Sequence, residues 1–476
     1  METGRRMYSI PPRITISALR GGSGKTLLSL GLVSAWEGRG LSVAPFKKGP
    51  DFIDAGWMSF AAGRPCRNLD PFLMTREQVI RSFALHASGL DFALVEGNRG
   101  LFDGLDVTGC CSTAELAKWL GSPVILVVDV TMSTRTVAAV VKGCQVFDPD
   151  LRVCGVILNR VAGPRQENLI REAVATYCGI PVVGSVPKLG KNLFPERHMG
   201  LVPHQEREEG RRAVAWTKEV VETHIDLAAI EEIMARQGSG DLQVSEEEAS
   251  SEILPLPPVR IGYILDRSFW FYYPENLEAL ERLGARLIRL DALEDPSLPP
   301  LDGLYIGGGF PETQAAGLAA NAGFRTSLRS AVEQGLPVYA ECGGLMYLGE
   351  ALEIEQAVYP MVGALPVAFE LMKRPQGHGY TVLRADAPNP FFREDTVIRG
   401  HEFHYSRPRL TRPLEARFAF KVERGHGIDG ARDGLWVKNL LGVYTHVHAA
   451  GDNLWARRLV EMAREFGGTD REFFHE

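Results

Sequence analysis

Short apolar runs alternate with amphipathic stretches along the first half of the chain, and most runs end in polar or glycine-rich residues. Runs of this length bounded by turn residues predict buried strands, whereas apolar residues recurring every three or four positions predict helices. Strands followed by helices in regular order predict a doubly wound, largely parallel sheet. The expected strands are residues 14–19, 43–46, 92–95, 123–128 and 153–158.

A polar stretch closed by prolines interrupts this pattern in the middle of the chain, and its composition is typical of a linker. Beyond it the parallel-sheet pattern restarts, with expected strands at 259–264, 285–290, 303–306 and 336–340. We therefore predict an α/β protein of two doubly wound domains, residues 1–235 and 259–476, joined by a linker at 236–258.

Composition narrows the class of protein. A chain of 476 residues with 50 glycines suits a multidomain enzyme with many tight turns. The net charge of -7 gives no support to binding of nucleic acid or an anionic membrane. The seven cysteines are scattered without metal-ligand spacing, which favours a reducing cytosol over a disulfide framework. With no signal peptide or membrane-spanning stretch expected, we predict a cytoplasmic location.

A glycine-rich loop joins the strand expected at 14–19 to a helix. Strand, glycine loop and helix form the context in which backbone N–H groups bind phosphates, a lysine reaches the β- and γ-phosphates, and a hydroxyl ligates Mg²⁺. The strict pattern fails at its first position, where Leu19 replaces glycine, so a glycine-rich turn without function stays open. The loop residues are Arg20, Gly21, Gly22, Ser23, Gly24, Lys25 and Thr26.

Charged residues follow two of the expected strands, at the edge where parallel sheets bind ligands. Lys47, Asp51 and Asp54 come after the strand at 43–46, and a solvated loop is the alternative interpretation. Glu96 ends the strand at 92–95 and is a candidate Mg²⁺ ligand or a structural carboxylate. Asn159 ends a further strand, where its amide could read the adenine edge of a nucleotide or simply form a turn.

The second half holds a lone cysteine in a strained setting. Cys342 lies between an apolar strand and the pair Gly343-Gly344, which predicts a sharp strand-to-helix turn that exposes a nucleophile. A buried structural cysteine is the alternative. The glycine-rich strand end at 307–309 could offer N–H groups to an oxyanion, and His446 supplies the base that a thiol nucleophile needs.

These motifs, in this order, resemble the cobyrinic acid a,c-diamide synthase family over nearly the whole chain. The first half is similar to dethiobiotin-synthetase-like ATP domains through its glycine loop, residues 47–54, 67–71 and 96–104. The second half is similar to triad-type class I glutamine amidotransferases, which are flavodoxin-like, through residues 307–312, 341–344, 400–406 and 444–446.

The resemblance implies an ATP- and glutamine-dependent ligase of cobalamin biosynthesis that amidates the a and c carboxylates of cobyrinic acid through an acyl phosphate. Cys342 would attack glutamine, His446 would move the proton, and N–H groups near Gly308, Gly309 and Gly343 would hold the oxyanion. Mg²⁺ would be held by Thr26, Glu96 and Asp51, and the acid substrate would meet Lys47, Asp51, Asp54 and Asp103. Ammonia would need protection from water on its way between the halves.

One position departs from the amidotransferase pattern. Many class I enzymes carry a glutamate two residues after the base, and here that position is His448. The resemblance therefore implies that the group orienting His446 is absent or comes from elsewhere. The 401–404 segment, whose two histidines are three apart and unlike a zinc motif, is given a structural or interdomain role. The vicinal pair Cys110-Cys111 is interpreted as small buried residues rather than a redox pair.

Two alternatives remain at this point. The glycine loop also resembles that of partition-type ATPase switches, which dimerise on ATP, and a homodimer stays open. The same reaction on hydrogenobyrinic acid or nickel sirohydrochlorin is the second alternative, because the sequence does not resolve the ring metal.

Overall fold

The structure is a computed structural model that describes residues 5–190, 204–237, 240–245, 258–413 and 417–472. By its contacts the chain divides into two compact units. Unit 1 comprises residues 1–199 and 203–248, and unit 2 comprises residues 200–202 and 249–476. Both are α/β, so the predicted fold class is confirmed.

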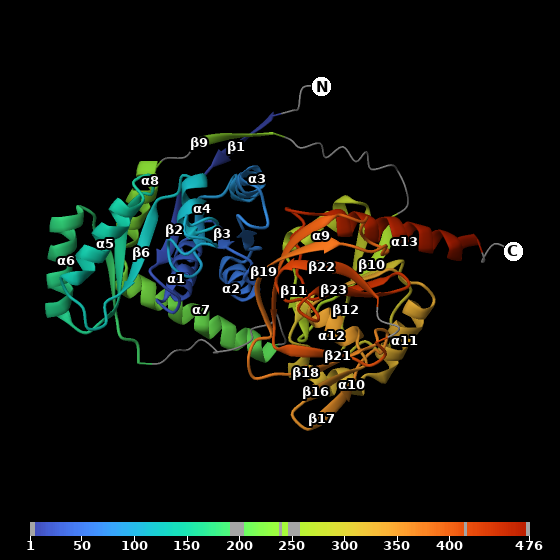
Figure 1. Cartoon of the computed structure of the whole chain (residues 1–476). Helices are drawn as coiled ribbons and strands as arrows, with labels where there is room; N and C mark the ends of the chain where they lie inside the picture. The colour runs from blue at the N-terminus through green and yellow to red at the C-terminus, as the bar shows by residue number, and fades with distance from the viewer. Residues whose placement is uncertain (1–4, 191–203, 238–239, 246–257, 414–416, 473–476) are drawn as a thin grey trace. The chain divides into compact units, whose positions relative to one another are not determined.

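Unit 1 is built on a seven-stranded sheet of order β4-β3-β5-β2-β6-β7-β8, with every neighbouring pair parallel. Apolar side chains of α1, α7 and α8 pack on one face of it, and those of α4, α5 and α6 pack on the other (Figure 1). Burial of both faces explains why these strands read as continuous apolar runs in the sequence.

The strands of unit 1 are β1 Arg5–Ile10, β2 Arg13–Ala18, β3 Val43–Lys48, β4 Arg67–Leu69, β5 Phe92–Glu96, β6 Val124–Asp129, β7 Val153–Val161, β8 Val182–Pro187 and β9 Gly240–Ser245. The helices are α1 Lys25–Glu37, α2 Phe52–Ala62, α3 Arg76–Ala87, α4 Thr113–Trp119, α5 Thr136–Phe147, α6 Pro164–Cys178, α7 His204–His224 and α8 Leu227–Gln237.

The linker predicted at 236–258 contains a regular element. Residues 240–245 form β9, which pairs antiparallel with β1. β1 and β9 lie far apart in the sequence, so no local sequence pattern predicts their pairing. Residues 238–239 and 246–257 of the predicted linker lie outside the described part of the chain.

Unit 2 contains a nine-stranded mixed sheet of order β12-β10-β13-β15-β24-β23-β22-β19-β20. Its first five strands are parallel, the four that the sequence predicts and β24, and the remaining neighbours are antiparallel. Side chains of α9 and α13 cover one face, and those of α10, α11 and α12 cover the other. A four-stranded sheet, β17-β16-β18-β21, packs beside α12.

The strands of unit 2 are β10 Val259–Ile264, β11 Phe269–Phe271, β12 Ala285–Leu290, β13 Gly303–Ile306, β14 Gly308–Gly309, β15 Val338–Glu341, β16 Ala351–Ile354, β17 Ala357–Pro360, β18 Val367–Leu371, β19 Gly377–Ala385, β20 Val397–His404, β21 Ser406–Leu410, β22 Phe418–Arg424, β23 Arg432–Val437 and β24 Leu440–Val443. The helices are α9 Pro274–Arg282, the 3-10 helix η1 Pro311–Gln314, α10 Ala315–Ala320, α11 Ala322–Glu333, α12 Gly343–Leu348 and α13 Leu454–Glu472.

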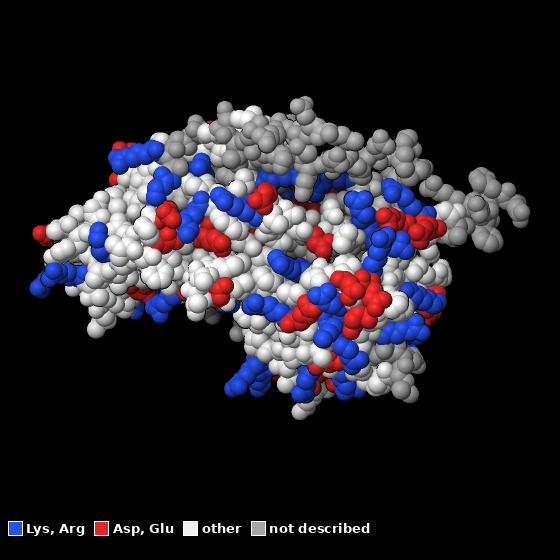
Figure 2. Space-filling view, turned by 45° about the horizontal axis from the view of Figure 1, so that its top comes forward, with Lys and Arg blue, Asp and Glu red and all other residues white. Residues whose placement is uncertain are grey.

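The surface carries charges of both signs. On the face drawn in Figure 2, cationic and anionic side chains are interspersed. Several form exposed ion pairs one helical turn apart, such as Arg236 with Glu232 and Arg329 with Glu333. Within the described residues, no helix is both long enough and apolar enough to cross a membrane.

Candidate functional site

The predicted phosphate-binding loop of unit 1 lies between the end of β2 and the start of α1. Gly24 caps α1 with φ at 94°, and a Cβ atom there would lie 2.5 Å from Nδ2 of Asn159. This nitrogen donates to the carbonyl oxygen of Ser23 at 2.9 Å. Only glycine therefore fits at position 24, and Asn159, expected to read adenine, contacts the loop itself.

Lys25 is the first residue of α1, and its side chain folds back onto the glycine loop. Its Nζ atom donates to the carbonyl oxygens of Arg99, at 2.8 Å, and Arg20, at 3.2 Å. Burial, and next the positive charge of Lys47, lower the pKa of Lys25. An ammonium group in this position contacts carbonyl oxygens and lies near another cation. It is well suited to exchange these contacts for hydrogen bonds that it donates to an anionic phosphate.

A buried cluster of charged groups forms where β3 and β5 end. Glu96 is fully buried, and its Oε1 atom accepts from Thr26 Oγ1 at 2.8 Å and from Lys47 Nζ at 2.8 Å. Lys47 also forms an ion pair with Asp54. Burial raises the pKa of Glu96 to about 7. Burial alone would lower the pKa of Lys47, but the Glu96 and Asp54 carboxylates outweigh it and raise that pKa.

The second oxygen of Glu96 is the atom that bears on metal binding. Oε2 is buried and has no hydrogen-bond partner in the described part of the chain. A buried carboxylate oxygen beside the Thr26 hydroxyl matches the hard oxygen ligands that Mg²⁺ prefers, so the residues present fit this ion.

Two of the predicted acidic residues have structural contacts. Asp51 caps α2, because its Oδ1 atom accepts from the backbone N–H groups of Ile53, at 2.8 Å, and Asp54, at 2.9 Å. Asp103 accepts from the N–H of Gly100 at 2.9 Å and closes the loop that follows β5. Both residues lie on segments at the ligand-binding edge, while part of each carboxylate is used to hold the backbone.

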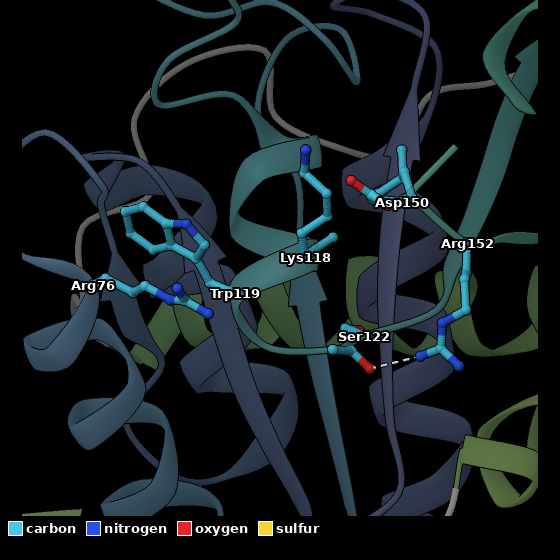
Figure 3. Close-up of a pocket in the computed structure, with 9 residues that line it drawn as sticks. Arg76, Lys118, Trp119, Ser122, Asp150 and Arg152 are labelled. Carbon is cyan, nitrogen blue, oxygen red and sulfur yellow. Dashed lines mark hydrogen bonds between the residues drawn. The ribbon is translucent and has the colours of Figure 1, made fainter. Parts of the chain in front are cut away.

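A cavity of about 350 Å³ lies away from this edge. Figure 3 shows Arg76, Lys118 and Trp119 around it, together with Asp150 and Arg152 from the segment before β7. Apart from Arg76 of α3, the lining residues lie in the segments that lead into β6 and β7, at the amino edge of the sheet, whereas the glycine loop follows the carboxyl end of β2. The cavity is therefore separate from the glycine loop and its charged cluster.

The predicted turn at Cys342 is present in unit 2. β15 ends at Glu341, α12 begins at Gly343, and Cys342 has φ at 46° and ψ at -99°. Such a backbone conformation is strained for a residue with a side chain. The N–H of Cys342 donates to the carbonyl oxygen of Val443 at 2.7 Å, which anchors the turn to the end of β24. The same sheet edge therefore carries Cys342 and, shortly after β24, His446.

The three glycines predicted for the oxyanion site come together at this edge. A Cβ atom on Gly308 would lie 2.3 Å from Cε1 of His446, and one on Gly343 would lie 3.0 Å from the backbone nitrogen of Gly309. Gly309 has φ at 153°, and its Cβ would lie 2.0 Å from the carbonyl oxygen of Ser268. Side chains are thus excluded where the backbone must approach the base and the nucleophile turn.

The structure supplies the acidic partner that the sequence could not identify. Oε2 of Glu341 lies 3.1 Å from Nδ1 of His446, and both side chains are at most 2 % exposed. Its other oxygen accepts from the N–H of Val447 at 3.4 Å. His448 instead faces Glu275, with Nε2 and Oε2 3.7 Å apart. Glu341 directly precedes the nucleophile, and that adjacency was the one signal available in the sequence.

The 401–404 segment of β20 frames the same site. His401 stacks on His446 with ring centres 4.9 Å apart, and the two residues exchange backbone hydrogen bonds. Glu402 accepts from the N–H groups of His426 and Gly427, at 2.5 and 2.9 Å. The carbonyl oxygen of Phe403 lies 3.8 Å from Sγ of Cys342. These contacts are structural ones within unit 2.

The vicinal cysteines lie in unit 1, just before α4. Their Sγ atoms are 3.3 Å apart, Cys111 is buried, and its backbone N–H donates to Glu115. The ligand atoms of Cys110, Cys111 and Glu115 all lie within 4.8 Å of one another, a grouping that spacing among cysteines alone did not predict. Burial, and next the contact with Cys110, raise the pKa of the Cys111 thiol, so its reactive thiolate form is disfavoured.

Comparison with known proteins identifies the family of both halves of the chain. Residues 14–201 match the CobQ/CobB/MinD/ParA nucleotide binding domain, and residues 260–454 match the CobB/CobQ-like glutamine amidotransferase domain. A protein of Magnetococcus marinus named cobyrinate a,c-diamide synthase is 44% identical over 96% of this chain and 98% of its own length. The chain belongs to the cobyrinate a,c-diamide synthase family.

Relatives of the same name occur in Archaeoglobus fulgidus, at 44% identity over 95% of this chain and 97% of the relative, and in Methanosarcina acetivorans, at 39% over 98% of each. As a member of the cobyrinate a,c-diamide synthase family, the chain is a glutamine-dependent amide-forming ligase. Its nucleotide-binding domain implies the use of ATP. The predictions of family and enzyme class are confirmed.

Proposed function

We propose that this chain amidates the a and c side-chain carboxylates of cobyrinic acid, using ATP and glutamine, through an acyl-phosphate intermediate. The observation that carries the proposal is the full-length similarity to relatives named for this substrate, in a chain that has both a phosphate-loop unit and a cysteine-turn unit. ATP is required because a carboxylate is a poor electrophile at neutral pH, and phosphorylation gives it a leaving group.

In unit 1, Lys25 and the N–H groups of the loop from Gly21 to Gly24 position the γ-phosphate of ATP. An oxygen of the substrate carboxylate attacks this phosphorus, and ADP departs. Ammonia then attacks the acyl carbon, phosphate leaves, and the amide remains. Lys47 stays protonated in its acidic cluster and, with Asp54 and Asp103, borders the acid substrate.

Thr26, Glu96 and Asp51 are the residues that would hold Mg²⁺. When bound, the ion neutralises charge that develops on the phosphate oxygens. Thr26 and Glu96 are hydrogen-bonded to each other in the structure. If both bound the ion, this hydrogen bond would rearrange. Lys47 would continue to balance the charge of Glu96 and Asp54.

In unit 2, Sγ of Cys342 attacks the side-chain amide carbon of glutamine, and His446 accepts the thiol proton. Backbone N–H groups near Gly308, Gly309 and Gly343 stabilise the oxyanion. His446 returns the proton to the departing ammonia, and water then hydrolyses the thioester to glutamate. Glu341 holds the His446 ring by its Nδ1 atom, so that Nε2 is available for the proton.

Single substitutions should distinguish the release of ammonia from glutamine, in unit 2, from the amidation of the acid, in unit 1. We expect Cys342→Ala to abolish amidation with glutamine yet to retain amidation with ammonium salts, because carboxylate activation belongs to unit 1. Lys25→Ala should stop amidation from either nitrogen source and retain basal glutamine hydrolysis. The measurement is the count of amides by mass spectrometry after incubation with ATP and Mg²⁺, with cobyrinic acid, hydrogenobyrinic acid and nickel sirohydrochlorin as parallel substrates.

Each outcome is decisive. Two amides on cobyrinic acid, and on neither other acid at a comparable rate, would support the proposed substrate. A rate of ATP hydrolysis that does not change when glutamine, ammonia or any of the acids is added would contradict the ligase mechanism. Loss of the ammonia-dependent reaction in Cys342→Ala would contradict the division of labour between the units.

A further inference from the structure

An acidic side chain beside the nucleophile turn plays no part in the mechanism above. Glu312 lies on η1, which begins directly after Phe310 and the glycine strand β14. The preceding residue, Pro311, is so near the turn that its Cδ atom would lie 3.1 Å from a Cβ built on Gly343. Glu312 is therefore fixed close to Cys342 by the same backbone that forms the oxyanion site.

This carboxylate is not balanced by a positive charge. Within the described residues it has no ion pair, and the hydrogen bond that it accepts comes from its own backbone N–H, although it is only partly exposed. Burial raises the pKa of Glu312 to about 7. By contrast, the buried carboxylates of Asp266 and Glu402 each accept two or more backbone hydrogen bonds. An uncompensated carboxylate lowers stability and is typical of a binding site rather than of packing.

The charge also opposes the reaction of its neighbour. Burial is the main cause that raises the pKa of the Cys342 thiol, and Glu312 is the charged group that raises it most, ahead of Glu341 and Glu402. These three carboxylates come from η1, β15 and β20. Glu341 faces His446 and Glu402 faces His404, whereas Glu312 faces no cation in the described part of the chain. A thiolate is the nucleophile, so burial and these carboxylates disfavour the reactive form of Cys342.

Glutamine can compensate the charge of Glu312 and lower the pKa of the Cys342 thiol, because its α-ammonium group is positively charged. Its α-ammonium group lies at the opposite end of the molecule from the amide that Cys342 attacks. An ammonium group placed on Glu312 would form a charge-assisted hydrogen bond and cancel the negative charge beside the thiol. A substrate with the amide but without the ammonium would leave the carboxylate uncompensated.

We propose that Glu312 binds the α-ammonium group of glutamine, so that glutamine itself favours the thiolate of Cys342. The inference rests on the proposed glutaminase role of Cys342. It makes Glu312 the residue that distinguishes glutamine from other primary amides, and it ties activation of the thiol to the presence of substrate.

The test compares glutamine with 4-carbamoylbutanoate, which is glutamine without its amino group, in the full-length protein. Wild-type protein should prefer glutamine strongly in kcat/KM for ammonia release. Glu312→Gln should lower kcat/KM for glutamine by about 30-fold or more, the usual cost of losing one partner of a charged pair, with most of the change in KM. The value for 4-carbamoylbutanoate should stay the same or rise, which also shows that the variant is folded.

A second readout has the opposite sign. Alkylation of Cys342 by iodoacetamide without glutamine should be faster in Glu312→Gln, because the negative charge that opposes the thiolate is gone. Mass spectrometry of the Cys342 peptide separates this reaction from alkylation of the other six cysteines. The matched control is Glu353→Gln, a partly exposed carboxylate of unit 2 paired with Arg409, which should keep the wild-type preference and alkylation rate.

Equal losses for both amides, or unchanged alkylation together with an unchanged preference for glutamine, would overturn the inference. Failure of the wild-type protein to release ammonia from glutamine would instead overturn the proposed function. The two failures are therefore distinguishable.

Discussion

At the scale of single residues, the pairing of Glu341 with His446 determines how the base can act. The contact is 3.1 Å from Oε2 to Nδ1 and is almost completely shielded from water. A carboxylate that accepts from Nδ1 fixes the ring and its tautomer and stabilises the imidazolium form. Because Glu341 and Cys342 are adjacent, one strand end positions both the nucleophile and the partner of its base.

We expect Glu341→Gln to lower kcat for glutamine hydrolysis by about 10²- to 10⁴-fold, because an amide can hold the wrong tautomer of His446. Amidation from ammonium salts should persist. Glutamate release and amide formation, measured side by side, check this. Glu275→Gln is the control, since Glu275 faces His448 rather than His446. A larger loss in the control than in Glu341→Gln would mean that the orienting group has been misassigned.

The carboxylate of Glu312 predicts a dependence of stability on pH. Its pKa is raised in the folded protein from an ordinary 4.5 to about 7, so between these values the folded state binds more protons than the unfolded state. The free energy of unfolding from this group therefore falls as pH rises through that window. Glu312→Gln should melt at a higher temperature than wild type at pH 8, with a smaller difference at pH 5. Equal differences at the two pH values would contradict this.

At the scale of elements, the glycine strand β14 is a spacer between the cysteine turn and the base. We expect Gly308→Ala to abolish glutamine hydrolysis, because the added methyl group would lie 2.3 Å from Cε1 of His446 and displace the ring. Ammonia-dependent amidation should continue. Gly468→Ala, in α13, is the matched control because nothing lies within 4 Å of its added Cβ. Hydrolysis at the wild-type rate in Gly308→Ala would show that the base lies elsewhere during turnover.

At the scale of the whole molecule, each unit has its own hydrophobic core, and each would carry one half of the proposed chemistry. A ligand that binds only the folded state of a unit slows local opening around its site. We therefore expect ATP with Mg²⁺ to slow hydrogen exchange in the loop at 20–24 and in α1. Lys25→Ala should lose this protection while its glutaminase rate is retained. Protection that survives in the variant would contradict the role of Lys25.

The sequence by itself determined the fold class, the family and the order of most of the parallel strands along the chain. It could do so because strands buried on both faces read as apolar runs, and because tight turns at phosphates and nucleophiles require glycine. Lys25 and Cys342 were proposed as functional residues for this reason, because each lies beside a glycine turn that the sequence shows.

Only the tertiary structure decided which distant groups meet. The pairing of β1 with β9, the antiparallel half of the second sheet and the contact of Asn159 with the glycine loop depend on segments far apart in the sequence. The sequence did not show that Glu341, rather than the residue at position 448, contacts His446. The parallel pairing of β15 with β24 brings the ends of these two strands together and so places Glu341 beside His446. Local pattern carries no information on such contacts, which follow from register and packing.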